Sequence, residues 1–561
     1  MLSFLKLNRN IRSIRRYWNI VRVLSAYGFD QVLEMMGLSD MVARSRRLLR
    51  HDDPAISRLT AAERMRLALE ELGPTFIKLG QLLSTRPDIV PAAFVYEFEK
   101  LQDNVPSFSF DEVKDQVERE LSCQIDYFYL NIDSIPLAAA SIAQVHRARL
   151  ISGEDVVIKV RRPGVAELVE ADISGLMGLA VLAERHFFGS EVYDPVGVVR
   201  EFARSIRREM DFTREGQTIE KMRDNFKGTP WMYFPQVFWE QSAHGVLTLE
   251  YIDGIKVSDL DALDRAGLDR KIIAKRGADA FLEMVLKHGF FHGDPHPGNV
   301  MIMPGNIICL LDYGIVGRLD EELKTFISDM LLAIVNHDME EVTSLLIFTG
   351  DTSDTLNVRA LKRDLSYFID SYYEVPLQQI EVGRMLMEFI EIITLYNIRI
   401  QPDLMLLAKS LVIVEGMGRN LDPSFNMIEH LRPFMEKAFK KKFSPRRISR
   451  DINSTLLSYI NLARTLPRDL KEIINRINKN KFKIDLEHRG LDKFTAEFDR
   501  SINRLSSSMI LAALIIGSSI IMQTERGPQL LGFPVLAFLG YTVAGVIGLW
   551  LVYAIIRSGR M

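Results

Sequence analysis

The sequence predicts an α+β fold of two lobes, followed by a pair of helices that could cross a membrane. Short patterns typical of strands are confined to the middle of the chain, between long stretches with helical spacing. Near the C-terminus, residues 505–524 and 527–556 contain no charged side chain, and each stretch can span a bilayer of about 30 Å. A buried hairpin of a soluble protein is the alternative. Small residues, in Ala513-x₃-Gly517 and Ala544-x₃-Gly548, would let two such helices pack closely.

Length and composition set broad limits. A chain of 561 residues can form two or more domains. Its 73 acidic and 70 basic residues nearly cancel, so the net charge does not indicate a nucleic-acid-binding protein. Cys123 and Cys309 do not form a metal-binding pair, and we expect reduced thiols and a functional face in the cytosol.

The N-terminal segment, residues 1–60, is predicted to be basic and helical. It lacks an apolar core of signal-peptide length, so we do not expect cleavage for secretion. Apolar residues alternate with basic residues along this segment. The segment could therefore lie on an anionic membrane surface or pack on the protein itself, and a mitochondrial or plastid presequence is a third possibility.

A helical extension is expected over residues 61–125. Pro74 suits the first turn of a helix that ends before Arg86-Pro87, and Lys78 and Gln81 share one face of it. Gly80 would cost about 1 kcal/mol in an ordinary helix, which suggests that another backbone passes close by. A K-x-G-Q pattern has little specificity by itself.

Residues 137–160 read as strand, turn and strand, with Lys159 near the end of the second strand. The stretch begins with a loop of small residues, Ala138, Ala139, Ala140 and Ser141. A kinase-type fold places its phosphate-binding lysine on such a strand, although its loop is usually rich in glycine. On its own, the pattern favours a hairpin with an exposed lysine, and only the metal site predicted downstream favours a functional lysine.

Two further stretches complete the first lobe. Residues 194–226 are predicted to be helical, and one of their acids should pair with Lys159. Glu209 and Glu215 lie about 240° apart on a straight helix, so both can face a cleft only if the helix breaks. Neighbouring arginines could equally make this an ordinary charged surface. Residues 245–254 read as a strand running into a glycine, a hinge whose backbone from Glu250 to Ile252 would be available to adenine.

Residues 288–312 are the most informative stretch, because they relate the other patterns to one site. A helix over 274–287 should end at Gly289, and Pro304-Gly305-Asn306 predicts a hairpin between strands 300–303 and 307–311. A hairpin brings its outer ends together, so Asn299 and Asp312 become neighbours. An amide oxygen beside a carboxylate suits Mg²⁺ on a nucleotide.

Asp294 lies in the loop before this hairpin. The pattern His292-x-Asp294-x₄-Asn299, followed by Asp312-Tyr313-Gly314, matches the protein-kinase elements H-R-D-x₄-N and D-F-G. The alternative is that these polar residues only cap turns and end a strand. That alternative leaves their joint spacing to chance, and we therefore predict a phosphoryl-transfer site and a bilobal protein-kinase-like fold.

Together these elements resemble the UbiB/AarF family of atypical kinase-like proteins, which is linked to ubiquinone biosynthesis. The motifs cover about residues 60–330. The resemblance assigns the following residues: Lys78 to Gln81 as the K-x-G-Q motif, Ala138 to Ser141 as the alanine-rich loop, Lys159 as the nucleotide lysine, Glu209 and Asp211 as the E-x-D acids, Glu215 as a further helix acid, His292 to Asn299 as the catalytic loop, and Asp312 to Gly314 as the metal motif. It also implies that the K-x-G-Q helix folds across the cleft where a peptide substrate would lie.

The sequence after the metal motif argues against a protein kinase. Only residues 315–319 precede an expected helix, and no A-P-E segment follows. A small or lipid substrate, or coupled ATP hydrolysis, is the better hypothesis. Residues 320–430 should form the helical lobe of an atypical kinase-like domain spanning 126–430. Residues 431–500 are expected to be a basic helical linker, either a solvated surface or one attracted to anionic lipids.

We therefore predict a membrane-anchored atypical kinase or ATPase that uses Mg-ATP to support isoprenoid-quinone biosynthesis. Asp294 would be the catalytic base or water-orienter, and Asn299 and Asp312 the metal ligands. Expected partners are anionic membrane lipids and quinone-biosynthesis enzymes or intermediates, at the bacterial inner membrane with the catalytic domain cytoplasmic, or at the mitochondrial inner membrane. The alternatives are a catalytically silent nucleotide-binding scaffold and a small-molecule kinase.

Overall fold

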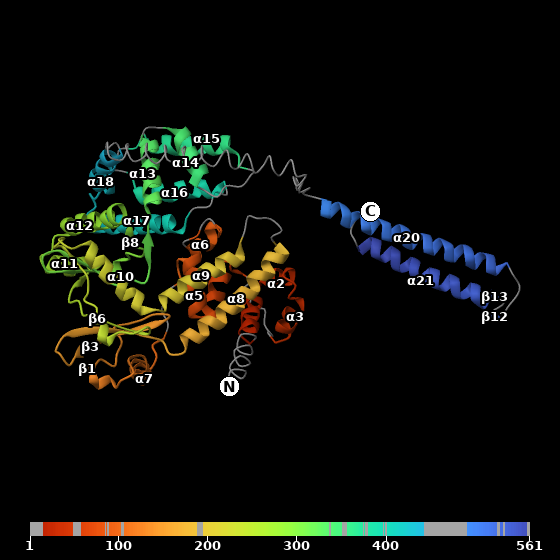
Figure 1. Ribbon diagram of the computed structural model, residues 1–561, viewed down its shortest axis with the longest axis horizontal. Coiled ribbons are helices and arrows are strands. Elements are labelled where there is room, and N and C mark those ends of the chain that lie inside the picture. The colour runs from red at the N-terminus through yellow and green to blue at the C-terminus, as the bar shows by residue number, and fades with distance from the viewer. Residues whose placement is uncertain are drawn as a thin grey trace, which may run out of the picture. The chain divides into compact units, whose positions relative to one another are not determined.

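The structure is a computed structural model of the chain. It describes residues 15–48, 58–84, 86, 89–101, 106–187, 194–335, 338–349, 356–373, 375, 380–396, 398, 401–442, 491–523, 528–530 and 533–557. The chain divides into two compact units, Met1–Ile448 and Ser449–Met561. Figure 1 labels the helices and strands of both units.

Helices make up the described chain before the first sheet. They are residues 15–26, α2 (Asp30–Met35), α3 (Ser39–Leu48), α4 (Ala61–Leu72), α5 (Pro74–Ser84), α6 (Ala92–Phe98) and α7 (Phe110–Leu121). Ile20, Val21 and Val23 are almost fully buried, and Arg16 pairs with the buried Asp172 of α8 (Val165–Phe187). The described part of the basic N-terminal segment thus packs on the protein itself. Residues 1–14 lie outside the described residues.

The K-x-G-Q helix forms as predicted, but the reason for its glycine differs. A Cβ added at Gly80 would lie 2.2 Å from Leu101 Cδ1 and 2.9 Å from Leu69 Cδ1. The expectation that a second backbone passes there is wrong, because leucine side chains from α4 and from the end of the α6 segment fill the space. Gly80 therefore permits close packing within the helical extension.

A five-stranded sheet forms the first lobe. It consists of β1 (Tyr129–Ile132), β3 (Ala143–Leu150), β4 (Asp155–Arg161) and β6 (Val246–Glu250) in that order, with β2 (Ala138–Ala139) paired to β3. Helix α7 covers one face, where Val113 and Val117 pack with Val156 and Ile158. Because strand side chains alternate, Lys159 lies on the other face. The predicted first strand starts late, at Ala143, because the alanine-rich segment folds back onto it.

The second lobe contains the predicted hairpin. A four-stranded sheet has the order β5 (Met232–Tyr233), β10 (Ile307–Leu310), β9 (Val300–Met303) and β7 (Ile255–Lys256), and β8 (Phe290–His292) pairs with β11 (Val316–Arg318). Met303 pairs with Ile307 and Val300 with Leu310, so the hairpin prediction is confirmed. Gly305 and Asn306 have φ values of 80° and 58°, the left-handed region that this turn requires.

The remaining helices of the larger unit connect these strands and continue the chain after them. They are α9 (Pro195–Glu209), α10 (Phe212–Asn225), α11 (Leu260–Arg265), α12 (Arg270–Leu282), α13 (Glu321–Val335), α14 (Met339–Thr349), α15 (Val358–Tyr373), α16 (Val382–Leu395), α17 (Pro402–Leu421) and α18 (Met427–Lys442). The short turns are η2 (Ile125–Tyr127), η3 (Trp239–Gln241), η4 (Glu283–His288) and η5 (Pro297–Asn299). The helix before the catalytic loop ends in the π-turn η4, and Gly289 caps it with φ 60° as expected.

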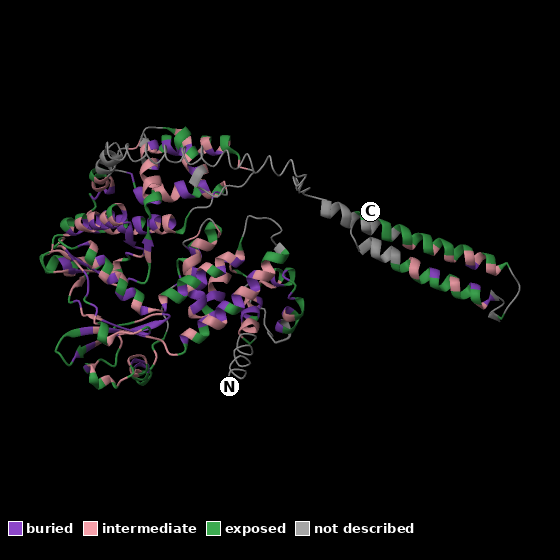
Figure 2. Cartoon of the chain, viewed as in Figure 1, coloured by how far each residue is buried: buried purple, intermediate pink, exposed green. Residues whose placement is uncertain are grey.

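The two largest apolar cores of the larger unit involve its helices. The main core joins the helical extension to α8, α9, α12 and the hairpin, and a second core lies among α13 to α16. Figure 2 shows the buried residues along the sides of α8 and α9 that face each other. Within the predicted basic run at 431–450, the described residues end at Lys442, and Arg432 is the one base whose side chain is described.

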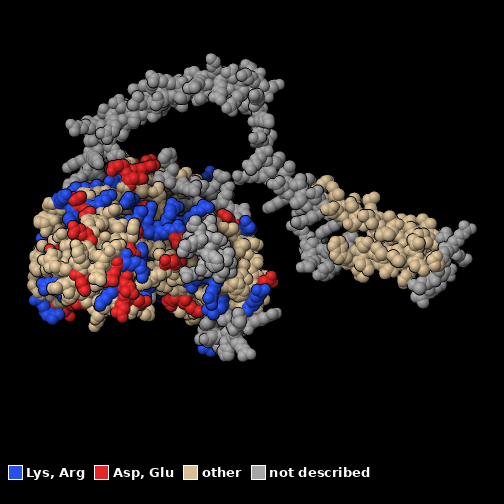
Figure 3. All heavy atoms as spheres, turned by 60° about the horizontal axis from the view of Figure 1, so that its bottom comes forward, with Lys and Arg blue, Asp and Glu red and all other residues tan. Residues whose placement is uncertain are grey.

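The described part of the second unit contains α20 (Leu491–Met522), a small hairpin of β12 (Gln529–Leu530) and β13 (Phe533–Pro534), and α21 (Val535–Arg557). Among the described residues, one helix is long and apolar enough to cross a membrane, at Leu505–Met522, and the apolar stretch Val535–Trp550 is shorter. The helix in the second predicted span starts at Val535, later than expected, because the short strands β12 and β13 occupy part of the stretch before it. On the face drawn in Figure 3, the described part of this unit shows no charged side chain.

Small residues pack between α20 and α21, but only some of the residues predicted for this contact are among them. A Cβ at Gly540 would lie 2.1 Å from Ser518 Oγ, and Ala544 is 4% exposed. By contrast, a Cβ at Gly517 would meet nothing within 4 Å. The Ala513-x₃-Gly517 pair therefore does not face α21, because the helical phase of α20 places Ser518 there instead.

An apolar cavity of about 30 Å³ behind the catalytic loop yields a stability prediction. Gly277 of α12 lines it, and a Cβ there would meet only Ile308 Cδ1, at 3.9 Å. Gly277→Ala should therefore stabilise the protein by about 1 kcal/mol, because alanine favours a helix interior and fits the space. Gly418 lines the same cavity, but its Cβ would lie 2.6 Å from the Phe425 ring, so Gly418→Ala should destabilise. Denaturant midpoints of both variants check this, and equal shifts would contradict it.

Candidate active site

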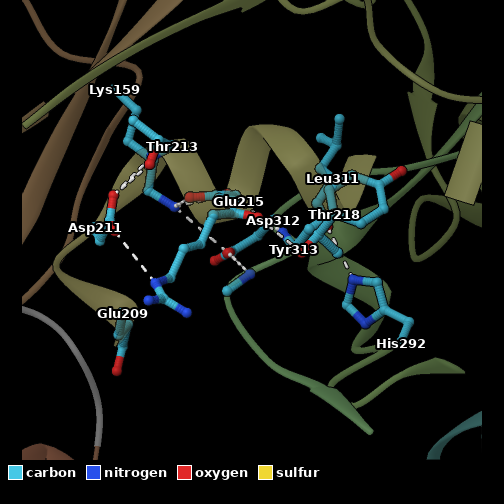
Figure 4. Close-up of polar contacts among 12 residues, drawn as sticks. Lys159, Glu209, Asp211, Thr213, Glu215, Thr218, His292, Leu311, Asp312 and Tyr313 are labelled. Carbon is cyan, nitrogen blue, oxygen red and sulfur yellow. Dashed lines mark hydrogen bonds and ion pairs between the residues drawn. The ribbon is translucent and has the colours of Figure 1, made fainter. Parts of the chain in front are cut away.

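Lys159 lies at the centre of the candidate site, on β4 between β3 and β6. Its Nζ donates to Glu215 Oε1 at 2.9 Å and to Oε2 at 2.8 Å, and lies 3.5 Å from Asp312 Oδ1 (Figure 4). The side chain of Glu215 is 6% exposed and that of Lys159 is 18% exposed. Strand β4, helix α10 and the metal motif thus meet at one ammonium group.

A break in the predicted helix lets Glu209 and Glu215 pair with different lysines. The stretch predicted as one helix is two, and it breaks at Met210 and Asp211. Glu215 pairs with Lys159, while Glu209 Oε1 lies 2.7 Å from Lys78 Nζ on α5. Both acids therefore face lysines, which a straight helix would not allow.

Local polar contacts explain the break. Asp211 caps the N-terminus of α10 by accepting from Thr213 N at 3.2 Å, and it also accepts from His244 Nδ1 at 2.8 Å. Arg161 donates to the Met210 carbonyl at 3.0 Å and to Glu120 Oε1 at 2.7 Å. Sequence reasoning missed Arg161, although its place two residues after Lys159 puts both side chains on one face of β4.

The hairpin places the two predicted metal ligands at its open end. Leu311 N donates to the Asn299 carbonyl at 2.8 Å, so Asp312 follows directly after the residue opposite Asn299. Asp312 has φ 50°, and its Oδ1 accepts from Gly314 N at 3.1 Å. Asn299 Nδ2 donates to the Asp294 carbonyl at 3.3 Å, which ties the catalytic loop to the hairpin.

Charges at this site are strongly coupled. Burial alone would lower the pKa of Lys159, but Asp312 and Glu215 raise it above the ordinary value of a lysine. Lys159 in turn lowers the pKa of Asp312 to about 2. At neutral pH Asp312 is therefore a carboxylate, and its side chain is 56% exposed, so a cation can reach it.

His292 connects the catalytic loop to the metal motif. It is 1% exposed, and burial lowers its pKa, so the ring is neutral at pH 7. Asp294 N donates to its Nδ1 at 3.2 Å, which places the ring proton on Nε2, where it is donated to the Leu311 carbonyl at 3.2 Å. Tyr313 packs beside it, 2% exposed, and donates its hydroxyl to the Leu310 carbonyl at 2.9 Å.

The alanine-rich loop forms a tight turn beside β3. Ala138 pairs with Val145, Ala139 with Gln144, and Ala140 N donates to the Ala143 carbonyl at 2.8 Å. Ser141 is fully buried, and its hydroxyl has no hydrogen-bond partner among the described residues.

Gln81, Glu250 and Ile252, also predicted to belong to the site, have other surroundings. Gln81 Nε2 donates to the Leu101 carbonyl at 3.2 Å, within the helical extension. The carboxylate of Glu250 accepts from Tyr233 at 2.8 Å and from Gln236 N at 3.1 Å. Ile252 is buried at 8% exposure in the hinge. Their predicted nucleotide contacts remain predictions.

The site offers two oxygen-bearing side chains, Asn299 and Asp312, to a magnesium ion. Among the described residues, no three or more His, Cys, Asp or Glu side chains gather where they could hold a metal by themselves. Asp312 and Asn299 offer hard oxygen atoms, of the kind that Mg²⁺ takes from a protein while it takes others from phosphates and water. The residues therefore fit an ion that arrives with a nucleotide.

Comparisons with known proteins identify the family of this chain. Residues 100–346 match the ABC1 atypical kinase-like domain, residues 365–426 the UbiB helical domain, and residues 489–557 the ABC1/UbiB kinase-like C-terminal domain. A protein of Clostridium pasteurianum, named only by its place in the hydrogenase 1 5′ region, is 32% identical over 98% of this chain and 100% of its own. A probable protein kinase UbiB of Aliivibrio fischeri is 36% identical over 77% of this chain and 80% of its own.

A solved structure is also similar, though distantly. It is a complex of the Mycobacterium tuberculosis protein Rv3197 with erythromycin, and it covers 65% of this chain and 96% of its own at 20% identity. The TM-score is 0.42, too low to support any argument about the site.

Proposed function

Because this chain belongs to the ABC1/UbiB family of atypical kinase-like proteins, we propose that it binds Mg-ATP between its two lobes and uses it to support isoprenoid-quinone biosynthesis. The observation that carries the proposal is the contact of Lys159 with both Glu215 and Asp312. In active kinases, the strand lysine pairs with a helix glutamate while the metal-binding aspartate lies nearby. The same three kinds of group meet in this protein.

Each site residue then has a role. Lys159 and the loop from Ala138 to Ser141 bind the phosphates, and the hinge backbone from Glu250 to Ile252 receives the adenine. Asn299 and Asp312 hold the magnesium ion, while Asp294 orients or deprotonates the attacking group. When bound, ATP supplies the phosphoryl group and Mg²⁺ neutralises charge on its phosphates.

The substrate is proposed to be a small molecule, a lipid or water. The segment after Gly314 runs through β11 directly into α13, which begins at Glu321, so it offers no extended loop for docking a peptide. Helix α5 also approaches the site, where Lys78 pairs with Glu209. We propose that this pair holds the K-x-G-Q helix across the cleft, with Gln81 on the same helix.

Attachment to a membrane is a further part of the proposal. The apolar helix Leu505–Met522 supports at least one span, and we propose that α21 forms the second. Arginines flank the outer ends of the two proposed spans, and such basic residues would place the catalytic unit on the cytoplasmic side of a bacterial inner membrane. The basic run at 431–450 would then meet anionic lipids, near quinone-biosynthesis enzymes or intermediates.

An assay with the purified full-length chain tests the function. Incubation with Mg-ATP and candidate quinone-pathway lipids should release phosphate or label a lipid, and removal of Mg²⁺ by a chelator should abolish the activity. Following free phosphate and labelled lipid in the same sample separates hydrolysis from transfer. Nucleotide binding without either product would favour a silent scaffold instead.

A further inference from the structure

Ser410 of α17 makes a contact that no motif anticipates. Its side chain is fully buried, and its hydroxyl lies 2.9 Å from the Gly293 carbonyl and 2.8 Å from the Leu406 carbonyl. The hydroxyl has one hydrogen, so the two carbonyls share a three-centre bond, in which the contact with Leu406 is the ordinary back-bond of a serine within a helix. The bond to Gly293 reaches another part of the chain, into the catalytic loop.

The peptide that accepts this bond is held from both sides. Gly293 directly precedes Asp294, and its N donates to the Ile315 carbonyl at 2.9 Å, in the segment after the metal motif. A Cβ at Gly293 would lie 2.7 Å from Ile315 Cγ2 and 2.8 Å from Leu406 Cδ2. The backbone beside Asp294 is therefore fixed between the metal-motif segment and α17.

Helix α17 is itself anchored at three points along its length. Near its start, Asp403 Oδ1 accepts from Arg318 N of β11 at 2.9 Å. Ser410 makes the central contact. Further along, the buried carboxylate of Glu415 accepts from Val382 N at 3.1 Å and Gly383 N at 2.7 Å, at the start of α16. A helix held in this way is a rigid support for the catalytic loop.

We infer that Ser410 is a positioning residue for Asp294, so that α17 of the helical region sets the place of the catalytic loop relative to the metal motif. This inference rests on the proposed function. Its physical basis is that a buried carbonyl without a donor costs free energy, so the loop would shift to find another partner. A shift of about 1 Å in a catalytic group can lower a rate by about 10²-fold.

Two variants with nearly the same shape isolate the hydroxyl. Ser410→Thr and Ser410→Val both add a methyl group, but only threonine keeps a donor for Gly293. In the full-length protein, amide hydrogen exchange of residues 290–299 should be close to wild type in Ser410→Thr and at least about tenfold faster in Ser410→Val. The kcat for ATP hydrolysis should fall about 10- to 100-fold in Ser410→Val, with KM for ATP unchanged. Ser410→Ala, which adds no volume, repeats the comparison if the larger side chains disturb folding.

Thr343 of α14 provides the matched control. It is 5% exposed, and its hydroxyl donates to the Met339 carbonyl of the same helix at 2.6 Å. Thr343→Val should change neither the exchange of residues 290–299 nor kcat.

Equal exchange and equal kcat in Ser410→Thr and Ser410→Val would overturn the inference. If the wild-type protein hydrolyses no ATP and transfers no phosphate, the proposed function fails. The exchange comparison, which needs no turnover, then still decides whether Ser410 holds the loop.

Discussion

Asp312→Asn is expected to lower ATP hydrolysis by about 10²-fold or more, because the substitution removes the negative charge that would hold Mg²⁺ against the phosphates. Asparagine is the right replacement because Asp312 has φ 50°, a conformation that asparagine tolerates better than other side chains do. The side chain is also largely exposed, so the fold should persist. Phosphate release under saturating Mg-ATP measures the effect, and thermal unfolding measures the fold.

The control for this variant makes the same chemical change eight residues later. Asp320 Oδ1 accepts from Leu323 N at 2.8 Å at the start of α13, and asparagine caps a helix about as well as aspartate. Asp320→Asn should therefore retain full turnover. Normal hydrolysis by Asp312→Asn would show that the metal motif is misassigned.

Lys159→Met is expected to affect both stability and nucleotide binding. The variant leaves the buried Glu215 without its ammonium partner, and breaking a buried ion pair in this way costs about 3–5 kcal/mol. Nucleotide affinity should also fall about 10- to 100-fold, because a charge-assisted hydrogen bond to the phosphates is lost. Denaturant unfolding and titration with a fluorescent nucleotide measure the two effects.

Two further variants separate these causes. In Lys159→Met/Glu215→Gln no unpaired charge remains, so most of the stability should return while nucleotide affinity stays low. Lys78→Met removes the other pair, but Glu209 is 20% exposed against 6% for Glu215, so water can reach its carboxylate and the loss of stability should be smaller than in Lys159→Met. If Lys159→Met and Lys78→Met are equally stable, Glu215 is not held as a buried charge.

Local patterns were enough to predict much of the site. The hairpin, its Gly305-Asn306 turn, the cap at Gly289 and the strand that carries Lys159 all form as predicted. Each of these depends on residues close together in the chain: a turn needs particular φ values, and a strand needs alternating side chains. The motif order then indicated the family, which the comparisons confirmed.

Contacts between distant segments decided the remainder. The sequence indicated that Glu209 and Glu215 could not both face a cleft from a straight helix, but contacts of Arg161, His244 and Asp211 decide where the helix breaks. The sequence likewise marked Gly80 as unusual, whereas packing against Leu101 explains it. The contact of Ser410 with Gly293 leaves no local signal, because a buried serine within a helix reads the same whether or not a second backbone accepts from it. Residue types and their spacing thus specify the chemical groups of this site and their local conformations. Long-range packing selects the partner of each group, because spacing along the chain does not specify which distant segment packs against a side chain.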